Sequence, residues 1–179
     1  MDQKVVDMAS PQPTPDPHPT PPFTISRATT PSDISAIASL FNAYVTWLNL
    51  DLTFQKYSIE LATLPGKYAP PTGSLLLARL KSSGEAIGCV ALRPLADDGI
   101  CEMKRLYVSP AGRGLGLGKA LAEAVVAEAR KLGYRATRLD TLPRMEAARA
   151  LYQRLGFREV EAYYESPLEG TIFLELELA

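Results

Sequence analysis

Runs of apolar residues alternate with polar and turn-forming residues along most of the chain, and the spacing within each run predicts its structure. Short apolar runs bounded by turn residues predict strands, whereas apolar residues recurring every three or four positions predict one face of a helix. The predicted strands span residues 23–28, 74–80, 85–92, 101–108, 135–140, 157–160 and 171–178. Two helices are expected after the first strand, one after the fourth and one after the fifth, which predicts an α/β fold with a mixed sheet.

Each predicted helix has a start or an end that the sequence marks. The four helices are expected to start at Thr30, at Asp51, after Gly118 and at Thr141. Pro31 suits the first turn of a helix, and Pro65-Gly66 should end the second helix. Gly133 and Gly156 fit the ends of the third and fourth helices, because glycine readily adopts the left-handed conformation found there.

The composition narrows the class of protein. The chain has 179 residues, of which 46 % are hydrophobic, and this suits one domain with a substantial core. Nineteen basic residues nearly balance twenty acidic residues, so we expect no nucleic-acid partner and no anionic membrane surface as a partner. No apolar run reaches the roughly 20 residues of a membrane span, and residues 1–10 lack the apolar core of a signal peptide. We therefore expect a cytoplasmic protein.

The first 22 residues differ in composition from the rest. Seven prolines fall between Pro11 and Pro22, and proline removes backbone donors and favours an extended chain. Residues 1–22 are therefore expected to form a disordered proline-rich tail, and residues 23–179 the folded domain. The tail is either passive or a ligand for a proline-binding module, and in the second case the protein would be an interaction module.

The positions of histidine and cysteine exclude several kinds of active site. The only histidine is His18, in the tail, so the folded part has no Ser-His or Cys-His nucleophile. Cys89 and Cys101 lie in strand-like runs and lack the neighbouring ligands that a metal site needs. We expect neither a disulfide framework nor a metal.

The segment 101–132 is the most informative part of the chain. A predicted strand is followed by four glycines at every second position, Gly112, Gly114, Gly116 and Gly118, and then by a predicted helix. A helix N-terminus attracts anions, and glycine lets an anion approach the backbone closely. The spacing fits neither the dinucleotide fingerprint nor the P-loop, which need glycines at other positions. The alternatives that remain are another kind of anion site and a tight turn needed only for packing.

Two segments carry a resemblance to a known family. Arg113-x-x-Gly116-x-Gly118, after a strand ending in Leu-Tyr-Val, resembles the coenzyme A pyrophosphate loop of the GNAT family of N-acetyltransferases. EAARALYQRLGF, residues 146–157, resembles the GNAT segment N-x-x-A-x-x-L-Y-x-x-x-G-F, although Met145 stands where asparagine is usual. The resemblance covers about residues 23–178 and implies the GNAT fold, with a mixed central sheet flanked by helices on both faces.

The resemblance implies that acetyl-CoA binds as a co-substrate. Carried over by position, the cofactor-binding residues are Leu106, Tyr107, Val108, Arg113, Gly114, Leu115, Gly116, Leu117, Gly118 and Lys119. Leu106 and Val108 would offer backbone groups to the pantetheine arm, as a neighbouring strand does. The amides from Gly114 to Lys119 and the side chain of Arg113 would bind the pyrophosphate.

The activity implied by the resemblance is transfer of an acetyl group to a primary amine, by direct attack in a ternary complex. Glu102 is the candidate base, acting through water, and the alternative is a strand carboxylate paired with Lys104 or Arg105. Tyr152 is the candidate acid for the departing thiolate, and the alternative is a tyrosine packed in the core. A sensor that binds acyl-CoA without turnover would use the same cleft.

The sequence does not name the acceptor. We expect a small-molecule or peptide amine, and Asp51, Glu60 and Glu102 indicate a cationic one. Aromatic residues also gather where GNAT proteins cover the acceptor pocket, and the alternative is that they belong to the core. They are Tyr44, Trp47, Phe54, Tyr57 and Tyr68. A homodimer is compatible with the resemblance.

Overall fold

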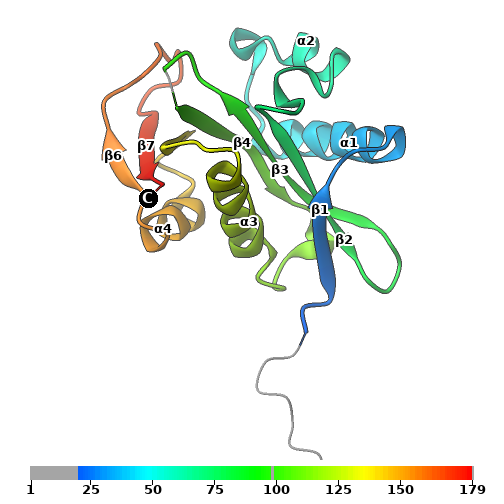
Figure 1. The fold of residues 1–179 in the computed structure, drawn as a ribbon. Helices are drawn as coiled ribbons and strands as arrows, with labels where there is room; N and C mark the ends of the chain where they lie inside the picture. Colours follow the sequence, from blue (N-terminus) through cyan, green and yellow to red (C-terminus); the bar gives the residue numbers. More distant parts are fainter. Residues whose placement is uncertain (1–19, 98, 179) are drawn as a thin grey trace, which may run out of the picture.

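A mixed sheet of seven strands forms the centre of the structure, a computed structural model that describes residues 20–97 and 99–178 (Figure 1). The strands are β1 (Phe23–Arg27), β2 (Ser74–Leu80), β3 (Ala86–Pro94), β4 (Ile100–Val108), β5 (Ala136–Thr141), β6 (Arg158–Val160) and β7 (Ile172–Glu177). Their order is β1-β2-β3-β4-β5-β7-β6, and β4 and β5 are the parallel pair. All seven predicted strands are confirmed, each within two residues at either end. Most of the predicted tail, residues 1–19, lies outside the described part.

Helices cover both faces of the sheet, as the resemblance implies (Figure 1). The helical segments are α1 (Pro31–Leu48), η1 (Thr53–Gln55), α2 (Tyr57–Ala62), η2 (Gly66–Tyr68), η3 (Pro110–Gly112), α3 (Leu117–Lys131) and α4 (Glu146–Arg154). Ile37 and Phe41 of α1 are fully buried against one face of β2 and β3. Leu121 and Val125 of α3 are buried in the larger core on the opposite face, which α4 also covers.

The start of α1 is where the sequence predicts it. The Thr30 side chain accepts a hydrogen bond from the Asp33 amide (3.1 Å), and the Asp33 carboxylate accepts one from the Thr30 amide (3.2 Å). This reciprocal capping satisfies two amides that a helix start otherwise leaves unpaired, and Pro31 follows at the first helical position.

The predicted second helix, residues 51–64, is shorter and interrupted. Asp51 accepts a hydrogen bond from the Thr53 amide (2.8 Å), which fixes a local turn in place of helix. A single 3₁₀ turn, Thr53–Gln55, follows, and Lys56 then adopts a left-handed φ of 56° before α2 begins. The predicted start was therefore wrong by six residues.

The fourth helix also begins later than predicted, at Glu146 instead of Thr141. Thr141 is the last residue of β5 and pairs with Ile172 of β7, so sheet pairing takes this residue. Leu142 precedes Pro143, and a residue before proline disfavours the helical conformation. The chain needs four further residues before it can enter α4.

Alternation along β2 shows how one strand contributes to both cores. Leu75 and Leu77 join the cluster under α1, whereas Leu76 and Ala78 join the larger cluster under α3. Successive side chains of a strand point to opposite faces. The continuous apolar run of β2 is therefore what a sheet covered on both sides requires.

A bulge in β4 distorts the middle of the sheet. Cys89 of β3 pairs with Tyr107, and Ala91 pairs with Lys104, so one residue of β3 faces two residues of β4. Within the bulge Arg105 adopts a positive φ of 58°, which is uncommon for a residue with a large side chain. The bulge bends the C-terminal half of β4 relative to its neighbours.

The strands β4 and β5 diverge beyond a short paired region. Ile100–Glu102 pairs with Ala136–Arg138, and the register includes no later pair. In the described structure, the edge of residues 103–108 that faces β5 therefore has no strand beside it. This divergence opens the space in which the candidate site lies.

Candidate active site

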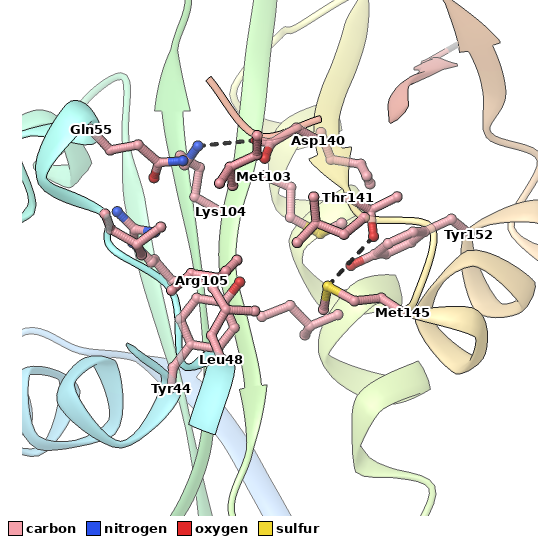
Figure 2. A pocket seen from close by; sticks show the side chains of 16 residues that line it. Tyr44, Leu48, Gln55, Met103, Lys104, Arg105, Asp140, Thr141, Met145 and Tyr152 are labelled. Atoms are coloured by element: carbon pink, nitrogen blue, oxygen red, sulfur yellow. Dashed lines mark hydrogen bonds and ion pairs between the residues drawn. The ribbon is translucent and has the colours of Figure 1, made fainter. Parts of the chain in front are cut away.

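A narrow pocket, which we call the inner pocket, lies between the diverging ends of β4 and β5 (Figure 2). Its volume is about 50 Å³, and most of its wall consists of leucine and methionine side chains. The polar residues that border it are Tyr44, Gln55, Lys104, Arg105, Asp140, Thr141 and Tyr152. Apolar walls with convergent polar groups are the usual composition of a site for a small molecule.

A wider groove, which we call the outer groove, runs from the end of β4 past the start of α3 and along α4. Its volume is about 770 Å³. Leu48, Leu106 and Met145 line both cavities, so the outer groove leads into the inner pocket. The charged residues of the outer groove are Arg113, Lys119, Arg144, Glu146 and Arg154. Four cations against one anion suit a polyanionic ligand.

The glycines of the predicted anion loop have different roles. A Cβ at Gly112 would lie 2.9 Å from the Ile87 carbonyl oxygen, so packing requires glycine there. Gly114 and Gly116 have φ values of +74° and +73°, and a Cβ at either position would project into open space. Packing therefore explains Gly112, whereas backbone conformation explains the other two and leaves room beside them.

The first turn of α3 presents unpaired amides at the outer groove. Gly116 is the N-cap residue, and no side chain caps the helix. The Ala120 amide is the first to bond back along the chain, to the Gly116 carbonyl (3.2 Å). Within the described residues, the amides of Leu117, Gly118 and Lys119 have no acceptor. This helix start can therefore bind an anion.

The structure brings six of the ten predicted cofactor-binding residues into the outer groove. They are Leu106, Tyr107, Val108, Arg113, Gly118 and Lys119. The other four, Gly114, Leu115, Gly116 and Leu117, lie in the loop and at the start of α3 and do not line the groove. The side chain of Leu117 is buried in the core, so only its backbone is available to a ligand.

Tyr152, the predicted acid, lies on α4 with its ring packed against Phe157 at 5.6 Å between ring centres. Figure 2 shows its hydroxyl group pointing towards Met145 and the inner pocket. Burial raises the pKa of Tyr152 above its usual range, and Tyr44 and Asp140 add to the shift. The phenol is therefore protonated at neutral pH. Core packing and a position on the pocket wall are both present in this one residue.

Glu102, the predicted base, is fully buried with its carboxylate already paired. Arg93 donates to Oε2 from Nε (2.7 Å), and the Tyr163 hydroxyl donates to Oε1 (2.9 Å). Lys104 Nζ lies 3.6 Å from Oε1, whereas Arg105 points elsewhere. Glu102 lines neither the outer groove nor the inner pocket, so its position is that of a salt-bridged strand carboxylate.

Three polar residues of the inner pocket are not marked as site residues by the sequence. Lys104 Nζ lies 3.1 Å from Asp140 Oδ1 across the gap between β4 and β5, with side chains 6 % and 21 % exposed. Figure 2 shows Gln55 beside this pair, and its Oε1 is buried without a partner. The sequence contains only two signals for this pair: Lys104 lies within an apolar strand, and Asp140 lies near the end of another strand. No local pattern predicts that the two side chains are in contact.

The acidic residues expected to attract a cationic acceptor are occupied. Glu60 accepts two hydrogen bonds from Arg105, of 2.8 and 3.0 Å, and Glu102 is paired with Arg93. The Asp51 carboxylate accepts a hydrogen bond from the Thr53 amide in a local turn. None of the three lines the inner pocket, so the indication of a cationic acceptor loses its basis.

The aromatic residues of this region divide between core and groove. Tyr68 packs edge-on against Phe41 in the core under α1. Trp47 is 53 % exposed and lines the outer groove, with its ring centre 6.4 Å from that of Tyr107. The side chain of Phe54 lies outside the described structure. Tyr68 therefore belongs to the core, whereas Trp47 lies in the outer groove.

Both cysteines are free and buried, and burial raises the pKa of Cys101 to about 11. They are therefore protonated thiols at neutral pH. In residues 20–97 and 99–178, no group of three or more histidine, cysteine or acidic side chains could hold a metal ion. None of the helices in that same part is both long and apolar enough to cross a membrane.

Comparison with known proteins adds an independent observation. Residues 38–157 match the model of the acetyltransferase (GNAT) family. An uncharacterized N-acetyltransferase of Schizosaccharomyces pombe is 41 % identical over 157 residues, which cover 88 % of this chain and 96 % of that protein. A solved structure described as an acyl-CoA N-acyltransferase of Klebsiella pneumoniae is 32 % identical, with a TM-score of 0.68 over 88 % of this chain and 98 % of that one. An acetyltransferase structure from Salmonella typhimurium, described with its cofactor acetyl-CoA, is 22 % identical with a TM-score of 0.62, covering 88 % and 95 %.

Proposed function

Because the chain belongs to the GNAT family of acetyltransferases, we propose that it transfers an acetyl group from acetyl-CoA to a primary amine by direct attack in a ternary complex. The junction of the two cavities carries this proposal: a cationic groove leads into a buried pocket whose wall bears a protonated tyrosine. Such an arrangement can hold a polyanionic donor on one side and a small acceptor on the other, which lowers the entropic cost of bringing them together.

The start of α3 binds the pyrophosphate of acetyl-CoA. The unpaired amides of residues 117–119 donate to phosphate oxygens, and Arg113 and Lys119 supply positive charge. The residues fit this group, because the positions beside Gly114 and Gly116 are open and no acceptor in the described chain uses the helix amides.

The free edge of β4 binds the pantetheine arm. Residues 106–108 line the outer groove and have no strand on the side facing β5, so their backbone groups can pair with an extended ligand as with another strand. Trp47 and Tyr107 add apolar contact area along the same part of the groove.

Tyr152 is the proton donor in this proposal. Acetyl-CoA supplies an acyl group activated as a thioester, and nucleophilic attack by the amine breaks the bond from carbon to sulfur. The Tyr152 hydroxyl, protonated because burial raises its pKa, donates its proton to the departing sulfur. No side chain forms a covalent intermediate, in keeping with the absence of histidine from residues 20–179.

Two carboxylates compete for the role of base. Glu102 is the base that the sequence predicts. Its two carboxylate oxygens accept hydrogen bonds from Arg93 and Tyr163, so Glu102 needs a bridging water to reach an amine. Asp140 borders the inner pocket directly and is partly exposed, and this position favours it. Either residue would take the proton that the ammonium must lose before attack.

A thiol-release assay with acetyl-CoA tests the proposal, run over amines of different charge and beside calorimetry of acetyl-CoA binding. We expect saturable binding and release of free coenzyme A that depends on an added amine. A sensor without turnover would bind acetyl-CoA with similar affinity and release no thiol with any amine. Failure to bind acetyl-CoA would contradict both functions.

A further inference from the structure

Lys104 and Asp140 form the charged end of the inner pocket, where their side chains converge with that of Gln55 (Figure 2). Lys104 is nearly inaccessible to solvent, and its ammonium lies 3.1 Å from Asp140 and 3.6 Å from Glu102. The charge of Glu102 is already matched by Arg93. Asp140 is therefore the main counterion of Lys104, and the two charges face the pocket together.

The pocket as a whole is electrically neutral. The remaining charged residue on its wall is Arg105, whose guanidinium is held by Glu60 through two hydrogen bonds. A guest with a net charge would leave that charge without a partner in a buried site, which is unfavourable. A diamine or other polycation would in addition place positive charge beside Lys104.

On the basis of the proposed function, we infer that the acceptor is a small amino acid, an amine with a carboxylate close to its amino group. The carboxylate pairs with Lys104, and the ammonium pairs with Asp140. A zwitterion satisfies both charges and adds no net charge to the pocket. The amino acid thus binds between Lys104 and Asp140, whose charges neutralise each other in its absence.

Gln55 and the apolar wall support the same class of acceptor. Gln55 Oε1 is buried and has no donor, so it can accept a hydrogen bond from the ammonium. The pocket volume of about 50 Å³, bounded mainly by leucine and methionine, leaves room for a short side chain only. Peptide N-termini and polyamines lack the adjacent carboxylate that Lys104 would bind.

The test uses the wild-type protein and needs no substitution. Thiol release from acetyl-CoA is measured with each of the common amino acids, then with the amide and the decarboxylated amine of the best one, and with a diamine. We expect kcat/KM for the amino acid to exceed that for its amide and its amine at least tenfold, with the diamine poorest.

The outcomes separate this inference from the proposed function. Equal or faster turnover of the amide, the amine or the diamine overturns the inference and leaves the acetyltransferase standing. Acetyl-CoA binding without turnover of any acceptor overturns both.

A substitution at Lys104 provides a second measurement. Lys104→Met keeps much of the length of the side chain and removes its charge, so the preference for the amino acid over its amide should fall towards one. Calorimetry of acetyl-CoA, together with the exposed-site control Lys131→Met, shows whether the fold and the outer groove are intact. An unchanged preference in a folded Lys104→Met protein overturns the inference, and if that variant does not fold, the wild-type series still decides.

Discussion

The outer groove and the inner pocket are built from different kinds of residue, although one leads into the other. A single stretch of sequence, residues 106–119, supplies the unpaired amides of the groove and two of its cations, Arg113 and Lys119. The inner pocket takes its polar groups from α1, η1, β4, β5 and α4, and its charges are held in pairs. In the proposed function, a local motif therefore supplies the affinity for a polyanion, whereas the chemistry depends on contacts between distant segments.

The two regions should respond differently to substitution. An exposed charge such as Arg113 contributes little to folding, so its loss should change binding alone. A pair such as Lys104 and Asp140, on the wall of the inner pocket, leaves a largely buried charge unmatched when one partner is removed, which costs stability. Variants of the groove should therefore alter affinity, and variants of the inner pocket should alter turnover and stability.

The largest effect is expected from Tyr152→Phe, which removes only the proton donor. The ring supplies most of the buried area, so its packing on Phe157 should survive. General acid catalysis contributes about 10²–10⁴-fold, and kcat should fall by an amount in that range. Affinity for acetyl-CoA should stay within a factor of about two, because the anion-binding groups lie in the other region.

Turnover in the Tyr152→Phe protein should be measured where chemistry limits the rate. If kcat stays above about half of the wild-type value there, Tyr152 is a core residue and not the acid.

A second comparison sets Asp140→Asn against Glu102→Gln. The position of Asp140 on the pocket wall predicts that its variant loses on the order of 10²-fold in kcat, most strongly at low pH, where free amine is scarcest. Glu102→Gln should mainly lower the free energy of unfolding, on the order of 3 kcal/mol, because it leaves Arg93 without a counterion.

Rate profiles against pH separate these roles. Denaturant melts should show a loss of stability in both variants, since Asp140→Asn removes the main counterion of Lys104. A steeper loss at low pH in Glu102→Gln than in Asp140→Asn would make Glu102 the base.

In the groove, Arg113→Ala should weaken acetyl-CoA binding by about ten- to a hundredfold, since a charged hydrogen bond is worth roughly 1.5–3 kcal/mol. The melting temperature and the kcat at saturating acetyl-CoA should not change. Calorimetry gives the dissociation constant, and Arg130→Ala, an exposed arginine at the other end of α3, is the control. Equal affinity in Arg113→Ala and Arg130→Ala would remove Arg113 from the site.

The smallest effect is expected from Gly116→Ala, matched with Gly133→Ala. Both glycines have positive φ, +73° and +82°, at the two ends of α3, and a Cβ at either would meet no other atom. Each substitution should therefore cost about 1–2 kcal/mol in stability for the same reason. Only Gly116→Ala should also weaken acetyl-CoA binding, by several-fold. Equal affinity for acetyl-CoA in the two variants would mean that Gly116 is needed only for the backbone conformation.

The sequence predicts the groove better than the pocket, and the reason is physical. The strand, the glycines and the helix start are consecutive, so local rules place Arg113 and Gly118 where the structure has them. The pairing of Lys104 with Asp140 depends on how β4 and β5 lie beside each other beyond their last paired residues, which no local pattern reports. Tyr152 lies on the pocket wall, and the motif that makes it a candidate is local as well, because it lies in and directly after one helix.

The errors in the fold have the same origin. The sequence pattern predicts too early a start for the second helix, because the Asp51 side chain forms a turn that competes with helix. The pattern also predicts too early a start for the fourth helix, because Thr141 pairs in the sheet with Ile172, a residue far along the chain. In the first place a side-chain hydrogen bond outweighs the helical pattern, and in the second place the pairing of two strands does.

The most direct test of the division between affinity and chemistry uses the chain's only tryptophan. Trp47 lines the outer groove and is half exposed, so its fluorescence should change when acetyl-CoA binds. Titration of wild-type and Tyr152→Phe proteins should give saturable changes with dissociation constants equal within about twofold, although turnover differs by about 10²-fold or more. No response to acetyl-CoA in the folded wild-type protein, with no heat of binding in calorimetry, would contradict the assignment of the groove. If the dissociation constant for acetyl-CoA rises in Tyr152→Phe by the same factor as kcat falls, the division of affinity and chemistry between the two regions is contradicted.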